Sequence, residues 1–158
     1  MKKPELIILI GNIGSGKSTY AKKYQKRGHI VIARDQLRYA IGDGKYIFNR
    51  DYEPVIWKTE LYMFKRFANL GVNMVIDEVG LSRKVRARYI PYAKLMGYKI
   101  IAIVMPFLDK KTSVNRRMKN PHGQPSKKLW SDVWTRFEIM YEPPLLEEGF
   151  NQIYHLKG

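Results

Sequence analysis

The chain has 158 residues, of which 45% are hydrophobic and 13% aromatic, so it can form the core of one globular domain but is short for two. It contains no cysteine, which excludes disulfides, thiolate metal sites and cysteine nucleophiles. With 29 Lys and Arg against 14 Asp and Glu, the formal net charge is +15, and this favours a polyanionic partner such as nucleic acid.

The N-terminal stretch MKKPELIILIG contains a short apolar run, Leu6–Ile10. This run is too short for the core of a signal peptide or for a membrane span, and no cleavage site of small residues follows it. We therefore expect a cytoplasmic protein, complete as given, with no membrane partner.

Short apolar runs alternate with helical patterns along the chain. The runs are continuous rather than alternating, which is typical of parallel strands that are covered on both faces. The predicted strands are Leu6–Ile10, His29–Ala33, Asn73–Asp77, Lys99–Met105 and Gln152–Leu156. Helices are predicted at Lys17–Lys26, at about Glu53–Asn69 and at Ser82–Met96. This order predicts an α/β fold with a parallel sheet of about five strands and helices on both faces.

The segment from about Asp109 to Tyr141 has a different character. It contains two helical patterns around PHGQP, a stretch of turn-forming residues between Pro121 and Pro125. The chain shows no internal repeat or linker, so we expect a single domain over residues 1–158.

The strongest motif is GNIGSGKS, which matches G-x-x-x-x-G-K-[ST] in full, follows a predicted strand and opens a predicted helix. In such a loop, glycines let backbone N–H groups surround phosphate oxygens at a helix N-terminus. Lys17 would reach the β- and γ-phosphates of a nucleoside triphosphate, and the Ser18 hydroxyl would hold Mg²⁺. The predicted nucleotide-binding residues are Gly11, Asn12, Ile13, Gly14, Ser15, Gly16, Lys17, Ser18 and Thr19.

Triphosphate binding leaves three classes open: a switch GTPase, a motor or signalling ATPase, and a kinase. A GTPase should carry an Asn/Thr-Lys-x-Asp segment late in the chain, and this sequence has none. A kinase needs a base for its acceptor and positive groups around the transferred phosphoryl group.

Asp35 is a candidate for that base, because it follows the second predicted strand at the sheet edge where α/β proteins bind ligands. Arg38, one helical turn later, would share its face and grip a negative group on the acceptor. The alternative is structural: Asp35 caps a helix of residues 36–41 and Arg38 makes a surface ion pair. Spacing alone does not decide between these interpretations.

Five stretches together extend this argument: GNIGSGKST, VIARDQLR, MVIDEVG, the downstream arginines and EPPLLEEGFNQIY. Over roughly residues 5–156 they resemble the kinase domain of polynucleotide 5′-hydroxyl kinases of the phage type, within a wider group of small P-loop kinases. The resemblance implies a P-loop kinase fold with strand order 2-3-1-4-5 and a helical lid over roughly residues 109–141. It also implies that Asp35 is the general base for a 5′-hydroxyl and that Arg38 contacts the 3′-phosphate of the acceptor.

Asp77 ends the third predicted strand and can hold Mg²⁺ through water or orient the acceptor. The alternative is that Asp77 or Glu78 makes only local caps or pairs. The family places an aspartate at the acceptor site and often continues Asp-x-Asn, whereas this chain has Asp77, Glu78 and Val79. The expected role of Asp77 is therefore acceptor binding, and the departure from the family pattern leaves its exact contacts open.

The segment KKTSVNRRMKN resembles the family's lid, whose arginines neutralise the transferring phosphoryl group. Arg116 and Arg117 are the expected catalytic arginines, with Lys119 behind them. The usual pair of arginines spaced four apart is not present, because Asn120 stands four residues after Arg116. The alternative for each of these charges is a solvated helix face.

Aromatic and basic residues alternate from Tyr39 to Lys58 and could stack acceptor bases while tracking phosphates. Tyr39, Tyr46 and Arg50 are the candidate contacts of this kind. Helical spacing instead assigns a second set of residues to packing: Trp57, Leu61, Phe64, Ala68, Trp130, Trp134 and Phe137.

These observations predict a Mg²⁺-dependent kinase that transfers the γ-phosphate of ATP or another nucleoside triphosphate to the 5′-hydroxyl of DNA or RNA. One alternative is a kinase of small metabolites or nucleosides with the same fold. Another is a nucleic-acid-dependent ATPase, which leaves the Asp35-x-x-Arg38 pattern unexplained. The sequence leaves open DNA against RNA, ATP against GTP, single strand against nick, and the oligomeric state.

Overall fold

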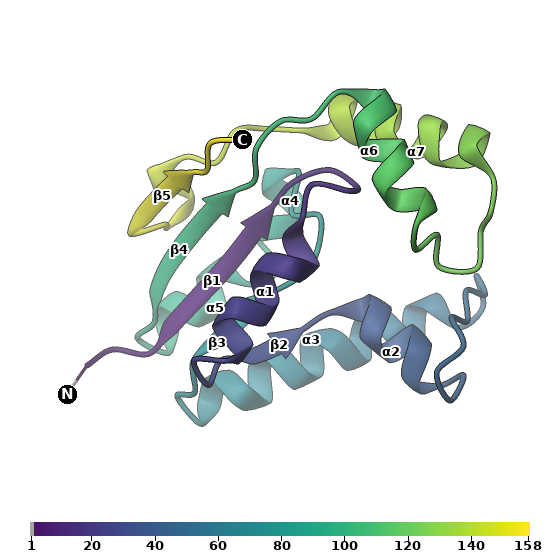
Figure 1. The fold of residues 1–158 in the computed structure, drawn as a ribbon. Helices are drawn as coiled ribbons and strands as arrows, with labels where there is room; N and C mark the ends of the chain where they lie inside the picture. Colours follow the sequence, from purple (N-terminus) through teal and green to yellow (C-terminus); the bar gives the residue numbers. More distant parts are fainter. Residues whose placement is uncertain (1) are drawn as a thin grey trace.

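The computed structural model describes residues 2–158, which form a five-stranded parallel sheet flanked by helices (Figure 1). The strands are β1 (Glu5–Ile10), β2 (Ile30–Ile32), β3 (Met74–Ile76), β4 (Lys99–Val104) and β5 (Gln152–His155). Their order, β2-β3-β1-β4-β5, confirms the predicted order 2-3-1-4-5. Leu6 pairs with Met74 on one side and with Ile100 on the other, so β1 lies at the centre of the sheet. Its apolar side chains are at most 1% exposed, as the continuous apolar run predicts.

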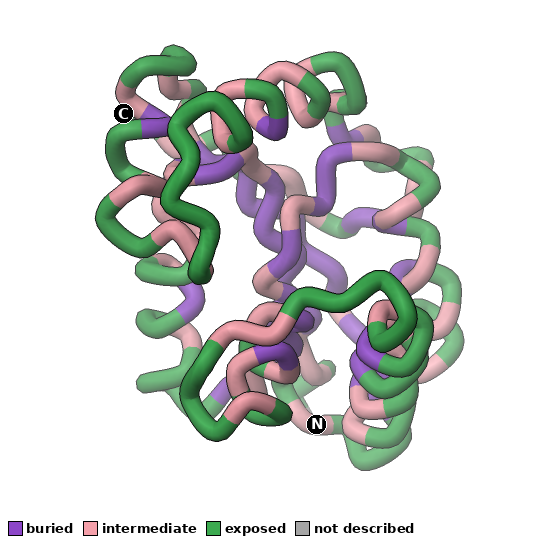
Figure 2. Tube along the Cα trace, turned by 90° about the vertical axis from the view of Figure 1, so that its right-hand side faces the viewer, coloured by how far each residue is buried: buried purple, intermediate pink, exposed green. Residues whose placement is uncertain are grey.

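One face of the sheet is covered by α3 (Glu53–Asn69) and α5 (Ile90–Leu95). Phe64 and Ala68 of α3 belong to this core, as their spacing predicts. Phe64 meets Tyr89 edge to face, with ring centroids 5.2 Å apart. Figure 2 shows the buried strands running through the middle of the molecule, with exposed turns around them.

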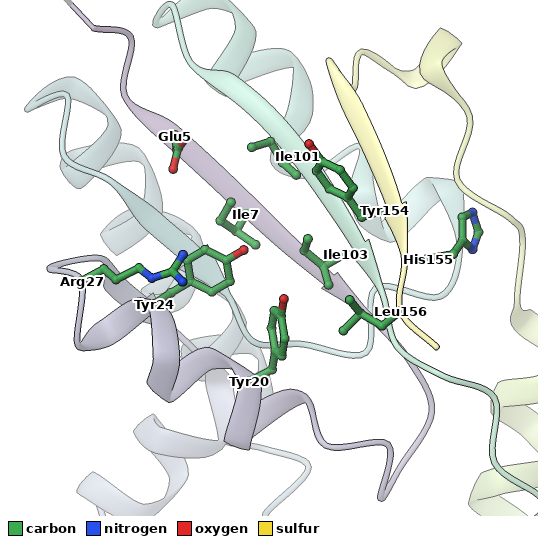
Figure 3. A pocket seen from close by; sticks show the side chains of 10 residues that line it. All are labelled: Glu5, Ile7, Tyr20, Tyr24, Arg27, Ile101, Ile103, Tyr154, His155 and Leu156. Atoms are coloured by element: carbon green, nitrogen blue, oxygen red, sulfur yellow. The ribbon is translucent and has the colours of Figure 1, made fainter. Parts of the chain in front are cut away.

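The other face is covered by α1 (Lys17–Gln25), whose Ala21 packs on Ile7 and Ile103. Tyr20 and Tyr24 project from α1 toward the sheet beside a groove of about 370 Å³ (Figure 3). The groove is lined by Glu5, Ile7, Tyr20, Tyr24, Arg27, Ile101, Ile103, Tyr154, His155 and Leu156. It shares no lining residue with the larger cavity described below.

The helix predicted at Ser82–Met96 is wrong as a continuous element. The structure has α4 (Arg83–Arg86) and α5 (Ile90–Leu95), with a turn between them. Pro91 is the cause, because it has no N–H to bond to the carbonyl of Ala87 and its ring would clash with that carbonyl. The proline is instead accommodated in the first turn of α5.

Two helices form what we call the helical arm, residues 110–140: α6 (Lys110–Met118) and α7 (Lys127–Met140). The Asp109 side chain accepts a hydrogen bond from the Thr112 N–H at the start of α6, and Ser126 caps α7 in the same way at Leu129. The arm lies beyond the C-terminal ends of the strands, across from α2 (Arg34–Ala40) (Figure 1). None of the helices within residues 2–158 is long and apolar enough to cross a membrane.

Candidate active site

The loop between β1 and α1 requires glycine at two points. Gly14 and Gly16 have φ angles of 67° and 96°, in the left-handed region that other residues adopt at a cost. The backbone of α6 also approaches Gly14 so closely that a Cβ there would lie 2.5 Å from the carbonyl oxygen of Ser113. The phosphate-loop motif therefore has the backbone conformation that it needs and is packed directly against the helical arm.

Lys17 is held within this loop. Its Nζ donates to the carbonyl oxygen of Asn12 at 2.8 Å and lies 3.5 Å from the Ser15 hydroxyl. Burial lowers the pKa of Lys17 to about 8, although nearby Asp77 opposes the shift. Ser18 and Thr19 follow in the first turn of α1 and are exposed. The loop thus presents one ammonium group and two hydroxyls toward a ligand.

Asp35 lies in the first turn of α2 and does not cap it. The cap position is Ala33, which makes no side-chain cap bond, so the capping interpretation of Asp35 is wrong. Its Oδ1 instead accepts hydrogen bonds from Nη1 of Arg38 at 2.7 Å and from the Tyr46 hydroxyl at 2.8 Å. Burial raises the pKa of Asp35, but His122, Tyr46 and Arg38 together outweigh it, so the net pKa lies below the ordinary value. Asp35 is therefore an ionised carboxylate at neutral pH, as a general base must be.

Arg38 is only 9% exposed, so the alternative of a surface ion pair is wrong. Its Nε and Nη2 donate to the two oxygens of Glu53 at 3.1 and 2.5 Å, while Nη1 donates to Asp35. This forked contact fixes the guanidinium plane beside the Asp35 carboxylate. Three of its five N–H groups serve these contacts, which leaves two for another anionic group.

Asp77 and Glu78 follow β3, next to the end of β2. Burial raises the pKa of Asp77, while Lys17 and the hydroxyl of Ser18 oppose the shift. The pKa values of Asp35 and Asp77 therefore move in opposite directions, as in sites where two carboxyl groups have different roles. Glu78 does not point to the solvent but binds Arg34, whose backbone N–H lies 2.5 Å from its Oε1.

The groups described above share one cavity of about 1030 Å³. Most of the site residues expected from the sequence line it: Ile13, Gly14, Ser15, Gly16, Lys17, Ser18, Thr19, Asp35, Arg38, Asp77, Arg116 and Arg117. The two exceptions are Gly11, whose N–H binds the carbonyl oxygen of Val79, and Asn12, whose side chain binds α7. Of the candidate acceptor contacts, Tyr46 and Arg50 line the cavity, whereas Tyr39 does not.

The two arginines of α6 have different surroundings. Arg116 is exposed, and its Nη1 lies 3.4 Å from the carbonyl oxygen of Gly14. Arg117 lies over the ring of Trp130, 4.9 Å from its centroid, and burial lowers its pKa. Lys119 does not line the cavity. Both expected arginines thus line the cavity, Arg116 contacts the phosphate loop, and Arg117 is the less exposed of the two.

The cavity also contains residues that sequence reasoning missed. Arg34, His122 and Arg136 contribute positive or titratable groups to its wall. Trp57, Trp130 and Phe137 also line the cavity, which corrects the prediction that these residues serve packing alone. The centroid of the Trp57 ring lies 3.6 Å from the guanidinium carbon of Arg34. The sequence offered one indication that Arg34 belongs to the site, because this residue immediately precedes Asp35. For His122 and Arg136 the only indication was their position within the expected lid.

No group of three or more His, Asp or Glu side chains that could hold a metal ion occurs within residues 2–158. The Ser18 hydroxyl and the Asp77 carboxylate nevertheless face the cavity beside the phosphate loop. A hydroxyl and a carboxylate are ligands that suit Mg²⁺, whose remaining positions are commonly filled by substrate phosphates and water. The residues present therefore fit a magnesium ion that arrives with a nucleotide.

A parallel sheet in the order 2-3-1-4-5 with a phosphate loop after its central strand defines the class of P-loop kinase folds. Residues 6–144 match the family model AAA_33, described as an AAA domain, and the chain belongs to this family. The family and the fold together indicate a nucleotide-binding domain of the P-loop kinase type.

The chain is also similar to individual proteins and solved structures. A protein of Autographa californica nuclear polyhedrosis virus, named "Putative bifunctional polynucleotide kinase/RNA ligase", is 28% identical over an alignment of 132 residues, and the match covers 73% of this chain and 18% of the viral protein. A solved Pnkp1/Rnl/Hen1 complex contains a chain that is 26% identical, with a TM-score of 0.57, over 73% of this chain and 40% of that one. A gluconokinase from Sinorhizobium meliloti 1021 shares the fold, with a TM-score of 0.59 and 18% identity, over 99% of this chain and 84% of that one. The chain thus spans less than half the length of the first two relatives.

Proposed function

We propose that this protein transfers the γ-phosphoryl group of ATP or another nucleoside triphosphate to the 5′-hydroxyl end of DNA or RNA. The observation that carries the proposal is that Asp35 and the phosphate loop face one cavity. A carboxylate kept ionised beside a triphosphate site is what a kinase needs to activate an acceptor hydroxyl. An ATPase without an acceptor would leave the pairing of Asp35 with Arg38 unexplained.

Each residue then has a distinct task. The backbone N–H groups of residues 13–19 and the Lys17 ammonium bind the phosphates, and Ser18, with Asp77 nearby, would hold Mg²⁺. When bound, Mg²⁺ would neutralise part of the charge on the phosphates. Arg38 orients the acceptor. In this proposal the helical arm is the lid, and Arg116 and Arg117 offset the charge on the transferring phosphoryl group.

In the chemical step, the acceptor oxygen forms a bond to the γ-phosphorus, and the bond from that phosphorus to the β–γ bridging oxygen breaks. Asp35 takes the proton that the acceptor hydroxyl loses. The nucleoside diphosphate leaves with the electron pair of the broken bond. The contribution of the protein is to align the two oxygens and to surround the phosphoryl group with fixed positive charge.

Two observations support nucleic acid as the acceptor. The net charge of +15 suits a polyanion, and aromatic and basic side chains such as Tyr46 and Arg50 line the acceptor side of the cavity. The name of the viral relative agrees with this acceptor, although that protein is much longer than this chain.

The test is transfer of label from γ-labelled ATP, with Mg²⁺, to a short oligonucleotide that has a 5′-hydroxyl, compared between the native chain and Asp35→Asn. Labelled oligonucleotide that depends on Asp35 supports the proposal. Phosphate released only to water would indicate an ATPase instead.

The salt dependence of the affinity for the acceptor tests the alternative that this protein is a small-molecule kinase. Affinity for a polynucleotide falls steeply as salt rises, because counterions are released on binding, whereas affinity for a neutral small acceptor hardly changes. We expect the KM for the oligonucleotide to rise about tenfold or more between 50 and 200 mM salt if it contacts several phosphates. Transfer to free nucleosides or metabolites with a salt-independent KM would overturn the polynucleotide assignment and leave the kinase chemistry intact.

A further inference from the structure

His122 lies in the connection between α6 and α7 and reaches across the cavity to Asp35. Its Nε2 is 3.6 Å from Oδ2 of Asp35, and its Nδ1 is 2.6 Å from the hydroxyl oxygen of Tyr39. The imidazole ring stacks on Tyr46, with centroids 4.8 Å apart and planes 23° from parallel. Three side chains from α2 and the loop that follows it thus fix both the position and the plane of this ring.

The two oxygens of Asp35 are not equivalent. Oδ1 already accepts hydrogen bonds from Arg38 and Tyr46, whereas Oδ2 faces His122. A proton that Asp35 takes from an acceptor is therefore best placed on Oδ2. The 3.6 Å separation is too long for a direct hydrogen bond, but catalytic contacts of this kind commonly shorten when substrate binds.

The backbone conformation of His122 and the charges around its ring are compatible with a role as a proton acceptor beside Asp35. His122 has a φ angle of 50°, in the left-handed region that residues other than glycine adopt at a cost, and its ring lines the cavity. Burial lowers the pKa of His122, Asp35 opposes the shift, and Arg117 and Arg38 add to it. The ring is therefore neutral near pH 7 and has a lone pair to accept a proton. The groups that face it from the elements around it are Asp35, Arg38, Tyr39, Tyr46, Arg117 and Trp130.

We propose that His122 accepts, at Nε2, the proton that Asp35 has taken from the acceptor hydroxyl, and so returns Asp35 to its ionised form. The inference rests on the proposed function. The O–H bond on Oδ2 breaks as the N–H bond on Nε2 forms. The imidazolium then gives its Nδ1 proton to the Tyr39 oxygen while Tyr39 releases its own proton to water, which leaves neutral His122 with its remaining proton on Nε2. Exchange with water restores the starting tautomer.

The experiment measures oligonucleotide phosphorylation by His122→Gln, His122→Phe and His122→Gly between pH 5.5 and 9. We expect kcat to fall about tenfold or more in all three variants, within the range of general acid–base effects, while the KM for ATP changes little. Imidazole in the buffer should restore activity to His122→Gly in proportion to the neutral imidazole present, and should leave the native chain unaffected. Phe keeps the stacking surface for Tyr46 but cannot accept a proton, so it separates packing from chemistry.

The thermal midpoint of each variant shows whether it is folded before its kcat is compared. Native kcat in His122→Phe would overturn the inference, because stacking alone would then explain the residue, and so would a folded His122→Gly that imidazole does not rescue. The two proposals fail differently. Transfer by the native chain together with unchanged His122 variants removes only this inference, whereas no transfer by the native chain overturns the proposed function and the inference with it.

Discussion

Arg34 and Glu78 join the ends of β2 and β3 through two contacts. Oε1 of Glu78 accepts a hydrogen bond from the Arg34 backbone N–H, and Oε2 lies 3.1 Å from Nη2 of the same arginine. Asp35 and Asp77 are the chain neighbours of this pair. This buried contact therefore helps to hold the two candidate functional carboxylates at a fixed separation, together with the pairing of β2 and β3.

Replacing Glu78 with Gln should change how stability depends on pH. Burial raises the pKa of Glu78 to about 8 in the folded chain, from 4.5 in the unfolded one, and this outweighs the opposing effect of Arg34. Between these values the folded form holds the proton more tightly, so this contribution to stability is present below pH 4.5 and is lost as pH rises to 8. Urea unfolding of both forms at pH 5 and pH 8 should show that the native chain loses more stability than Glu78→Gln. If the free energy of unfolding fell by the same amount in both proteins between pH 5 and pH 8, this expectation would be contradicted.

Binding of ATP should take up protons near pH 8. The pKa of Lys17 is about 8 without a ligand, and adjacent phosphates favour the charged ammonium. Affinity for ATP should therefore fall as pH rises above 8. Calorimetric titrations in two buffers of different ionisation enthalpy measure the proton uptake directly. Lys17→Arg is the control, because its guanidinium stays charged throughout and should show no uptake from this position.

Gly14→Ala should weaken nucleotide binding far more than Gly28→Ala. Both glycines have positive φ angles, 67° and 92°, so both substitutions carry the backbone cost of about 1–2 kcal/mol. A Cβ at position 14 would also meet the carbonyl oxygen of Ser113, whereas nothing lies within 4 Å of a Cβ at position 28. We expect Gly14→Ala to lower ATP affinity about tenfold or more, which corresponds to at least about 1.4 kcal/mol, and Gly28→Ala to leave it unchanged. Equal losses of affinity would show that the contact with α6 is unimportant.

Glu148→Ala should destabilise the fold strongly. Arg86 is 0% exposed, and its Nε and Nη2 donate to Glu148 at 2.7 and 2.9 Å. Removing Glu148 leaves a buried charge without its partner, at a cost of about 3–5 kcal/mol. Asp132→Ala breaks the exposed pair with Lys128 and should cost less than about 0.5 kcal/mol. The free energy of unfolding in urea compares the two, and similar losses would contradict the argument from burial.

The fold followed from local patterns because parallel strands buried on both faces leave a clear apolar signature. The same patterns could not reveal the break at Pro91, since the helical spacing of apolar residues continues across it. In the candidate site, the phosphate loop and Asp35 were found because each lies within a short motif. His122 could not be found in this way, since its contacts with Tyr39 and Asp35 join segments more than 80 residues apart. Arg34 was missed because its partner, Glu78, follows β3 and lies 44 residues further along the chain.

Asn12 belongs to the phosphate loop, yet its side-chain amide donates to the Trp134 carbonyl at 3.0 Å and to Glu138 at 3.1 Å. The loop is thereby fastened to α7, the helix that supplies Arg136 and Phe137 to the cavity wall. Because these two hydrogen bonds fix the loop to the wall of the cavity within the protein itself, binding of one substrate is not needed to form the binding site of the other. We therefore expect the two substrates to add in random order, with little dependence of the affinity for one on the presence of the other.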